Sequence, residues 1–145
     1  MTHLYDELIG VLEKEFALCT SLVELLQREK EVIVKLDPGA LEQLLTEKEV
    51  LTTSIRACDE ARERILDTLQ LKNKTLSEVA ASAGELYRDR LADLSTKFTS
   101  IIESITELNA FNSKLIEKSL HYIKTSYRFL NTFDVDVRQK VSLEA

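Results

Sequence analysis

Leu36-Asp37-Pro38-Gly39 is the sharpest break in the first seventy residues, and it decides the fold. Asp37 belongs to the residue types that cap helix starts. Pro38 suits a first helical position, because its missing N–H would be unpaired there anyway. The break at 36–39 therefore separates two helices. Because the turn is so short, the sequence predicts that these helices fold back on each other as an antiparallel hairpin.

Both flanking segments carry apolar residues at alternating spacings of four and three, which is typical of long amphipathic helices with a coiled-coil-like seam. They predict helices over 4–34 and 38–70. Eight of ten seam positions are apolar in the first helix: Leu4, Leu8, Val11, Glu15, Leu18, Leu22, Leu25, Glu29, Val32 and Leu36. Seven of nine are apolar in the second: Leu41, Leu44, Lys48, Leu51, Ile55, Cys58, Arg62, Ile65 and Leu69.

The rest of the chain predicts a short helix, a very long helix and a tail. Thr75 and Glu78 fit a capping box, so we expect a short helix over 76–82 that ends before Gly84. The same seam spacing then predicts a third long helix over 85–131, followed by a tail over 132–145. The fold class is therefore an all-α, coiled-coil-like bundle in a single domain over 1–145.

The third helix is too long for the hairpin to cover. At about 1.5 Å per residue, the hairpin helices span roughly 45–50 Å and the third roughly 70 Å. If the third helix starts at the open end of the hairpin, residues beyond about 117 project past the turn. That part holds four of the nine aromatic residues of the chain, Tyr122, Tyr127, Phe129 and Phe133. Apolar surface that the chain cannot cover itself indicates a partner or self-association site.

Composition argues against several classes of function. The net charge is −6, whereas nucleic-acid binding needs a clustered basic surface. Neither a signal-peptide pattern nor an apolar run of about 20 residues is present, so we expect a cytoplasmic protein without stable membrane insertion. No metal-ligand, phosphate-binding or nucleophile motif occurs, which predicts no enzyme activity, metal or cofactor. Cys19 and Cys58 are expected to lie near each other as packing residues, with a redox role left open.

The last third of the chain carries the pattern Leu108-Asn109-x-x-Asn112-x-x-Leu115-Ile116-x-x-Ser119-Leu120-x-Tyr122-Ile123. In this pattern the chain resembles the FlgN-like flagellar export chaperones. A second stretch is similar to the turn and second helix of that family: Leu36-Asp37, then Leu41-x-x-Leu44-Leu45-x-Glu47-Lys48-Glu49-x-Leu51. The similarity covers nearly the whole chain in the same order.

This resemblance implies a cytoplasmic chaperone of type III flagellar export. Such chaperones bind the C-terminal helical segments of hook-associated (hook–filament junction) proteins and prevent premature assembly and degradation; the export apparatus is a further partner. Client binding in the family is associated with the C-terminal region. An added amphipathic helix could pack there, on Leu120, Tyr122, Ile123, Tyr127, Phe129, Leu130, Phe133, Val135 and Val137.

Alternatives stay open for both residues and function. Asn109, Asn112 and Ser119 are assigned to helix register or core polar pairing, with client contact as the other interpretation. The aromatic residues could instead be core, if the third helix bends back or forms a homo-oligomer. The chain could thus be a structural, self-assembling coiled-coil protein, or a related export chaperone for another flagellar client.

Overall fold

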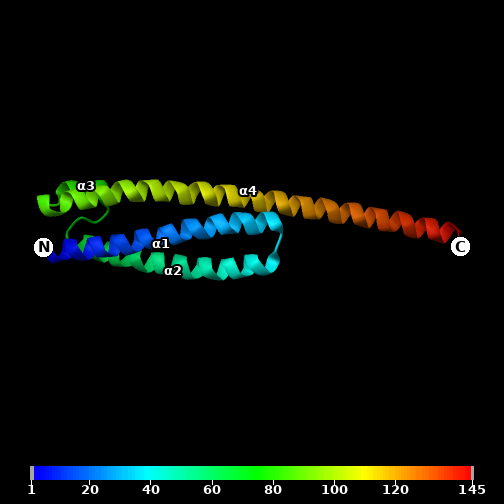
Figure 1. Ribbon diagram of the computed structural model, residues 1–145, viewed down its shortest axis with the longest axis horizontal. Coiled ribbons are helices and arrows are strands. Elements are labelled where there is room, and N and C mark those ends of the chain that lie inside the picture. Colours follow the sequence, from blue (N-terminus) through cyan, green and yellow to red (C-terminus); the bar gives the residue numbers. More distant parts are fainter. Residues whose placement is uncertain (1, 145) are drawn as a thin grey trace.

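The computed structural model describes the backbone of residues 2–144 and the side chains of residues 2–132. It contains four helices: α1 (Thr2–Lys35), α2 (Pro38–Thr68), α3 (Leu76–Ser82) and α4 (Glu85–Glu144). Residues 2–144 contain no strand. The predicted all-α fold is therefore confirmed, with a helical hairpin, a short helix and a very long helix (Figure 1).

The hairpin turn forms as its residues predict. Leu36 adopts a left-handed backbone with φ 53°, which ends α1. The Asp37 carboxylate accepts a hydrogen bond of 3.2 Å from the backbone N–H of Ala40, and Pro38 is the first residue of α2. The cap pairs one of the N–H groups that every helix start leaves free, so α2 begins at a defined residue.

A compact connection returns the chain to the open end of the hairpin. Gln70 and Asn73 have positive φ angles of 62° and 65°, so the chain turns sharply between α2 and α3. The Thr75 hydroxyl accepts a hydrogen bond from the N–H of Glu78 at 3.1 Å and caps α3. Because α3 is so short, α4 starts next to the N-terminus of the chain.

As a result, α4 runs parallel to α1. The Tyr87 hydroxyl donates a hydrogen bond of 3.0 Å to the carbonyl of Thr2. Further along, the Phe16 and Phe98 rings meet edge to face with centroids 5.8 Å apart. Helix α1 packs against both α2 and α4, whereas α2 and α4 make no backbone contact with each other (Figure 1).

The core is densest at the open end, where α1, α2, α3 and α4 meet. Its buried members are Leu8, Ile9, Leu12, Cys19, Leu66, Leu69, Val79, Ala80, Ala83, Tyr87, Leu91, Leu94 and Phe98. Most of them occupy or adjoin the predicted seams. Burial of this apolar surface supplies the main driving force for docking α4 onto the hairpin.

The end of α4 differs from the sequence prediction. We expected the helix to stop near Asn131 and a tail to follow over 132–145, but α4 continues to Glu144. The apolar spacing becomes irregular after Asn131, which suggested an end. However, residues 85–144 contain neither proline nor glycine, so no local signal terminates the helix.

One seam position in the hairpin holds a buried acid. Glu15 of α1 is 4% exposed, and its Oε2 lies 3.7 Å from Nη1 of Arg62 on α2. Arg62 also lies 3.1 Å from the Asp59 carboxylate. Burial and a hydrogen bond with Asp59 raise the pKa of Glu15 from 4.5 to about 8, although Arg62 opposes this shift. The rise prevails because one guanidinium serves more than one carboxylate, so Glu15 is mostly protonated at neutral pH.

Because the pKa of Glu15 is raised on folding, we predict that the stability of the folded protein depends on pH. A carboxyl group whose pKa is raised on folding stabilises the folded state fully below pH 4.5, and this contribution is lost as the pH rises through about 8. Glu15→Gln should remove that dependence and unfold at higher urea concentration than wild type at pH 9. Urea titrations from pH 5 to 9 measure the free energy of unfolding at each pH. Glu31→Gln is the control, because Glu31 is exposed. If Glu15→Gln lost stability with rising pH as much as Glu31→Gln and wild type do, Glu15 would not be the source of the pH dependence.

The two cysteines are free and buried, as expected for packing residues. Burial, with the charges of Glu15, Asp59 and Cys58, raises the pKa of the Cys19 thiol to about 11. The proximity of the two thiols stays a prediction. Because thiolates are the reactive form, Cys19 is protected against alkylation in the folded protein.

Candidate partner-binding surface on the end of α4

The hairpin ends where the last part of α4 continues alone. Along the contact between α1 and α4, Lys30 and Phe111 are 81 positions apart, Phe16 and Phe98 are 82 apart, and Leu26 and Asn112 are 86 apart. These offsets place Lys35, the last residue of α1, beside residues 116–121 of α4. We call residues 120–144 the overhang. It spans about 37 Å at 1.5 Å per residue, and it projects past the turn in Figure 1.

The face of α4 that is buried at the open end of the hairpin points in the same direction as part of the overhang. With about 3.6 residues per turn, residues 36 apart point in the same direction after ten turns. Tyr87, Leu91 and Leu94 are all buried in the core, and Ile123, Tyr127 and Leu130 follow them at that spacing. Together with Leu120, these three residues form what we call the inner face of the overhang (Leu120, Ile123, Tyr127 and Leu130).

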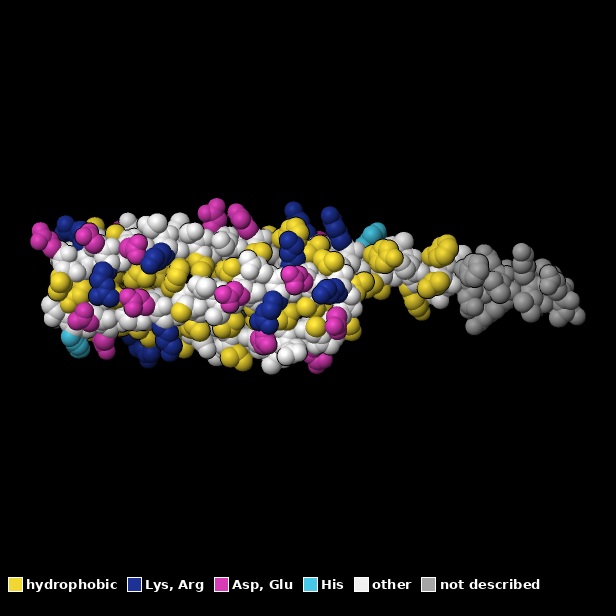
Figure 2. All heavy atoms as spheres, in the orientation of Figure 1, with side chains coloured by type: hydrophobic (Ala, Val, Ile, Leu, Met, Phe, Trp, Pro, Cys, Tyr) yellow, Lys and Arg dark blue, Asp and Glu magenta, His cyan; other side chains and the backbone are white. Residues whose placement is uncertain are grey.

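The inner face is apolar and exposed. Tyr127 and Leu130 are 66% and 61% exposed, whereas Leu91, which occupies the same helical position as Tyr127, is fully buried. Figure 2 shows hydrophobic side chains gathered on the stem where α4 leaves the body of the molecule. Leu91 is covered in the core at the open end of the hairpin, and this cover ends before the overhang, because Asn109, 18 residues after Leu91 and 18 before Tyr127, is already exposed.

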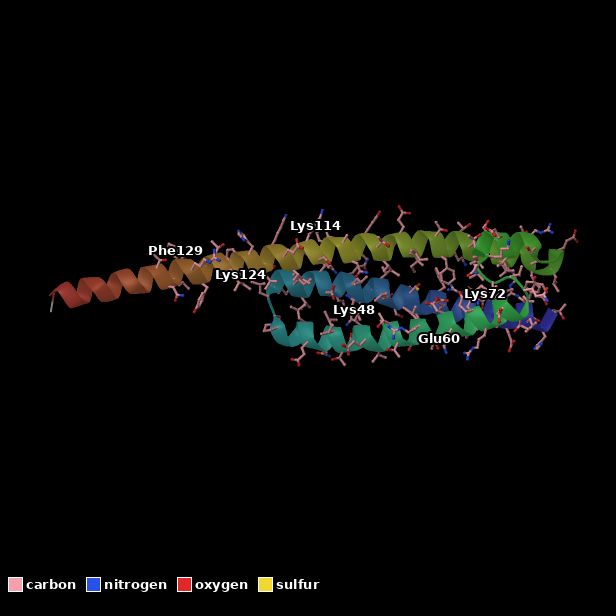
Figure 3. The ribbon with its side chains drawn as sticks, turned by 180° about the vertical axis from the view of Figure 1, so that it is seen from behind. Lys48, Glu60, Lys72, Lys114, Lys124 and Phe129 are labelled. Atoms are coloured by element: carbon pink, nitrogen blue, oxygen red, sulfur yellow. The ribbon has the colours of Figure 1, made fainter. Side chains whose placement is uncertain are left out.

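The structure brings most predicted client-contact residues onto this stem. Exposed side chains there are Leu120, Tyr122, Ile123, Tyr127, Phe129 and Leu130. Phe129 is labelled on the projecting part of α4 in Figure 3. Phe133, Val135 and Val137 lie outside the residues whose side chains are described. In the single chain the aromatic side chains at 122, 127 and 129 are therefore not core residues.

The three residues predicted to set the helix register differ in their burial. Asn112 is 1% exposed, and its amide nitrogen donates to the Leu26 carbonyl at 2.9 Å and to the Glu29 carboxylate at 3.0 Å. Ser119 is half-buried near the end of α1. Asn109 is exposed, so its assignment to the core was wrong. Three residues before Asn112 on a helix, its side chain points about 60° away, past the edge of the α1 contact.

Asn112 belongs to a polar link across three helices. Glu29 of α1 accepts its hydrogen bond and also lies 3.4 Å from the Lys48 ammonium group of α2. Lys48 is labelled within the hairpin region in Figure 3. The link sits about two turns before the overhang begins. A slip of α4 along α1 would leave the buried Asn112 amide without the Leu26 and Glu29 acceptors, so the link sets where the overhang starts.

Basic residues line the opposite side of the same stretch. Lys114, Lys118 and Arg128 point away from the inner face when projected on the helix, whereas Lys124 borders it about 40° from Leu120. Lys114 extends away from the hairpin in Figure 3. Residues 1–70, by contrast, carry 15 acids and 8 bases. The stem is thus apolar toward the hairpin side and basic toward solvent.

The sequence pattern of the FlgN protein family matches residues 1–136, which include the hairpin, the link and the first part of the overhang. The chain belongs to the FlgN family. Searches of curated proteins and of solved structures gave no significant match. The resemblance inferred from the asparagine pattern is thereby confirmed, and FlgN-family proteins are flagellar export chaperones rather than a family of enzymes.

Two further properties concern this FlgN-family chain as a whole. Across residues 2–144, no helix combines the length and apolar character that a bilayer span requires. Among the side chains of residues 2–132, no cluster of three or more His, Cys, Asp or Glu is arranged to bind a metal ion.

Sequence reasoning missed two apolar residues of the surface. Ile116 is 42% exposed just before the overhang, and Phe111 is exposed with the Lys30 ammonium group 4.8 Å from its ring centroid. Both residues could have been found by comparing apolar residues 18 positions apart in the sequence, which is five helical turns. Ile116 lies 18 residues after the buried Phe98, and Phe111 lies 18 residues before the exposed Phe129.

Proposed function

We propose that this FlgN-family protein is a cytoplasmic chaperone of type III flagellar export that binds C-terminal helical segments of hook–filament junction proteins. It would hold these segments unassembled and protected from degradation until export. The observation that carries the proposal is the inner face of the overhang. The inner face repeats the helical positions that are buried at the open end of the hairpin, on a stretch of α4 that no described residue covers.

The geometry suggests how a client helix binds. The client segment takes the position beside α4 that α1 leaves at Lys35, and it packs on Leu120, Ile123, Tyr127 and Leu130. An amphipathic helix with apolar residues every three or four positions is the complement of such a face. The client would bury there the apolar stripe that it otherwise uses for assembly, and so remain unpolymerised.

Deleting residues 120–145 tests this function. We expect client binding to fall below detection, because the inner face is lost. The hairpin, the core and the Asn112 link all precede residue 120, so the thermal unfolding of the truncated chain should stay cooperative. Calorimetric titration of a junction protein into both forms measures binding, and circular dichroism checks the fold. Undiminished binding by the truncated chain would disprove the assignment.

The two other functions predict different outcomes in the same experiment. A self-assembling protein would show a molar mass that rises with concentration in the full chain and would ignore the junction proteins. A chaperone for another flagellar client would remain free in the presence of junction proteins but co-purify with that client from flagellated cells.

A further inference from the structure

The stretch of α4 around the start of the overhang is basic. Between Glu117 and Asp134 the sequence holds two lysines and one arginine, Lys118, Lys124 and Arg128, and no acid. All three are exposed, and Lys124 is labelled where α4 leaves the hairpin in Figure 3. Among the side chains of residues 2–132, no carboxylate lies within 4.0 Å of their charged nitrogen atoms. As far as residue 132, these charges are available to a partner.

Elsewhere in the molecule, bases at helix contacts pair with acids of the neighbouring helix. Lys48 of α2 lies 3.4 Å from the Glu29 carboxylate of α1. Arg90 of α4 lies 3.2 Å from the Glu13 carboxylate of α1. We expect a helix that packs on the overhang to supply acids in the same way, because the overhang itself has none before Asp134.

The bases border the inner face on one side only. At about 100° per residue, the four inner-face residues span about 80° of the helix circumference. Lys124 and Arg128, which we call the basic edge, lie about 80° and 120° from the centre of this face. Ser126 and Tyr122 lie at the same angles on the other side and are uncharged. A helix that packs on the inner face therefore meets positive charge along one of its two flanks.

A second overhang would not neutralise the basic edge. In an antiparallel pair of overhangs, the basic edges of the two copies would face each other, which is unfavourable for like charges. In a parallel pair, Lys124 of one copy would face Ser126 of the other, which carries no acid. A partner with an acidic flank complements the edge, whereas a second overhang in either direction does not.

From these observations we propose that the client helix carries acids along one flank of its apolar stripe, and that Lys124 and Arg128 pair with this flank. The inference rests on the proposed client-binding function and specifies the chemistry of the partner: an amphipathic helix that is acidic on one side of its stripe and uncharged on the other. Charge pairs at the border of an interface chiefly select the partner and speed association, whereas buried apolar contacts supply most of the affinity.

The basic edge also fixes the direction of the client helix. The inner-face residues follow the a and d spacing of a heptad, which places Lys124 at position e and Ser126 at position g. Position e of one helix faces g of a parallel partner and e of an antiparallel partner. A client helix with acids at g therefore lies parallel to α4, and one with acids at e lies antiparallel. Turned end for end, either helix would place its acids against Ser126.

Charge reversal in the full chain tests the proposal. The probe is the C-terminal helical fragment of a junction protein. Lys124→Glu with Arg128→Glu should weaken its binding about tenfold or more at about 0.1 M salt and less than about threefold at about 1 M salt, because ions screen exposed charges. Lys114→Glu with Lys118→Glu is the control. It makes the same change of charge on the opposite side of α4 and should alter binding less than about twofold. Calorimetric titration measures the affinities, and circular dichroism checks the fold.

Lysine substitutions in the fragment complete the test. Replacing the acids on one flank of its apolar stripe should restore binding to the Lys124→Glu and Arg128→Glu variant, and replacing those on the other flank should not. Equal affinities of wild type and both variants would reject the basic edge and keep the client-binding function. Failure of wild type to bind the fragment would reject both. Binding to phosphatidylglycerol vesicles, or a dimer that is lost in the charge-reversal variant, would then assign the edge to a lipid surface or to a second copy.

Discussion

Asn112→Asp is expected to lower the free energy of unfolding by about 3–5 kcal/mol at neutral pH, because it buries an unpaired charge. The new carboxylate would replace an amide that donates hydrogen bonds to the Leu26 carbonyl and the Glu29 carboxylate. Two acceptors and a second negative charge would then face each other in a site that is 1% exposed. Lys48 lies 3.4 Å from the other oxygen of Glu29 and cannot neutralise both acids.

Urea unfolding at several pH values measures this effect. The pKa of the new aspartate should be raised by burial and by Glu29, so the loss of stability should shrink as the pH falls through that raised pKa and should be smallest below the unfolded value of about 3.9. Asn109→Asp is the matched control, since Asn109 carries the same side chain on the same helix and is exposed. It should change the free energy of unfolding by about 0.5 kcal/mol or less. Similar losses in both variants would mean that the link does not hold α4.

Leu91→Ala is expected to destabilise the protein by about 2–5 kcal/mol, because it leaves a cavity in the core. Leu91 is fully buried and belongs to the cluster in which Leu8, Leu12 and Val79 join three helices. Removal of its side chain weakens the contact that holds α4 parallel to α1. Thermal and urea denaturation followed by circular dichroism would report the change.

Leu86→Ala is the control for this substitution. Leu86 lies in the first turns of the same helix but is 73% exposed, so its truncation removes the same atoms without a cavity. The expected change is within about 0.5 kcal/mol. If both leucine variants were equally stable, the core at the open end of the hairpin would not be packed as described.

The sequence was sufficient to predict the hairpin and the place where α4 outruns it. Asp37 and Pro38 have a strong local preference for a helix start, and the apolar spacing of α4 carries the same seam that α1 buries from Tyr87 to Leu94. These signals are local or strictly periodic. The elements that they predict therefore form in the folded protein.

Other features depend on long-range contacts that spacing alone cannot specify. Asn109 and Asn112 look equivalent in the sequence, and only the docking of α4 at Leu26 and Glu29 buries one of them. The end of α4 was placed too early because loss of the apolar pattern reports loss of a partner, whereas the helix itself persists to Glu144. For the same reason the sequence left open whether the aromatic residues are core or surface.

The anchored part of α4 has a consequence for the energetics of the overhang. An isolated helix must first form a costly nucleus, in which several residues are ordered for a single hydrogen bond. The overhang avoids this step, because its helix only has to propagate from turns that the hairpin already holds in place. A client would then meet a surface whose backbone is ordered before binding, which lowers the entropy lost on association. Under the proposed function, the hairpin would therefore raise the affinity for a client that contacts only the overhang, because it nucleates the helix to which the client binds.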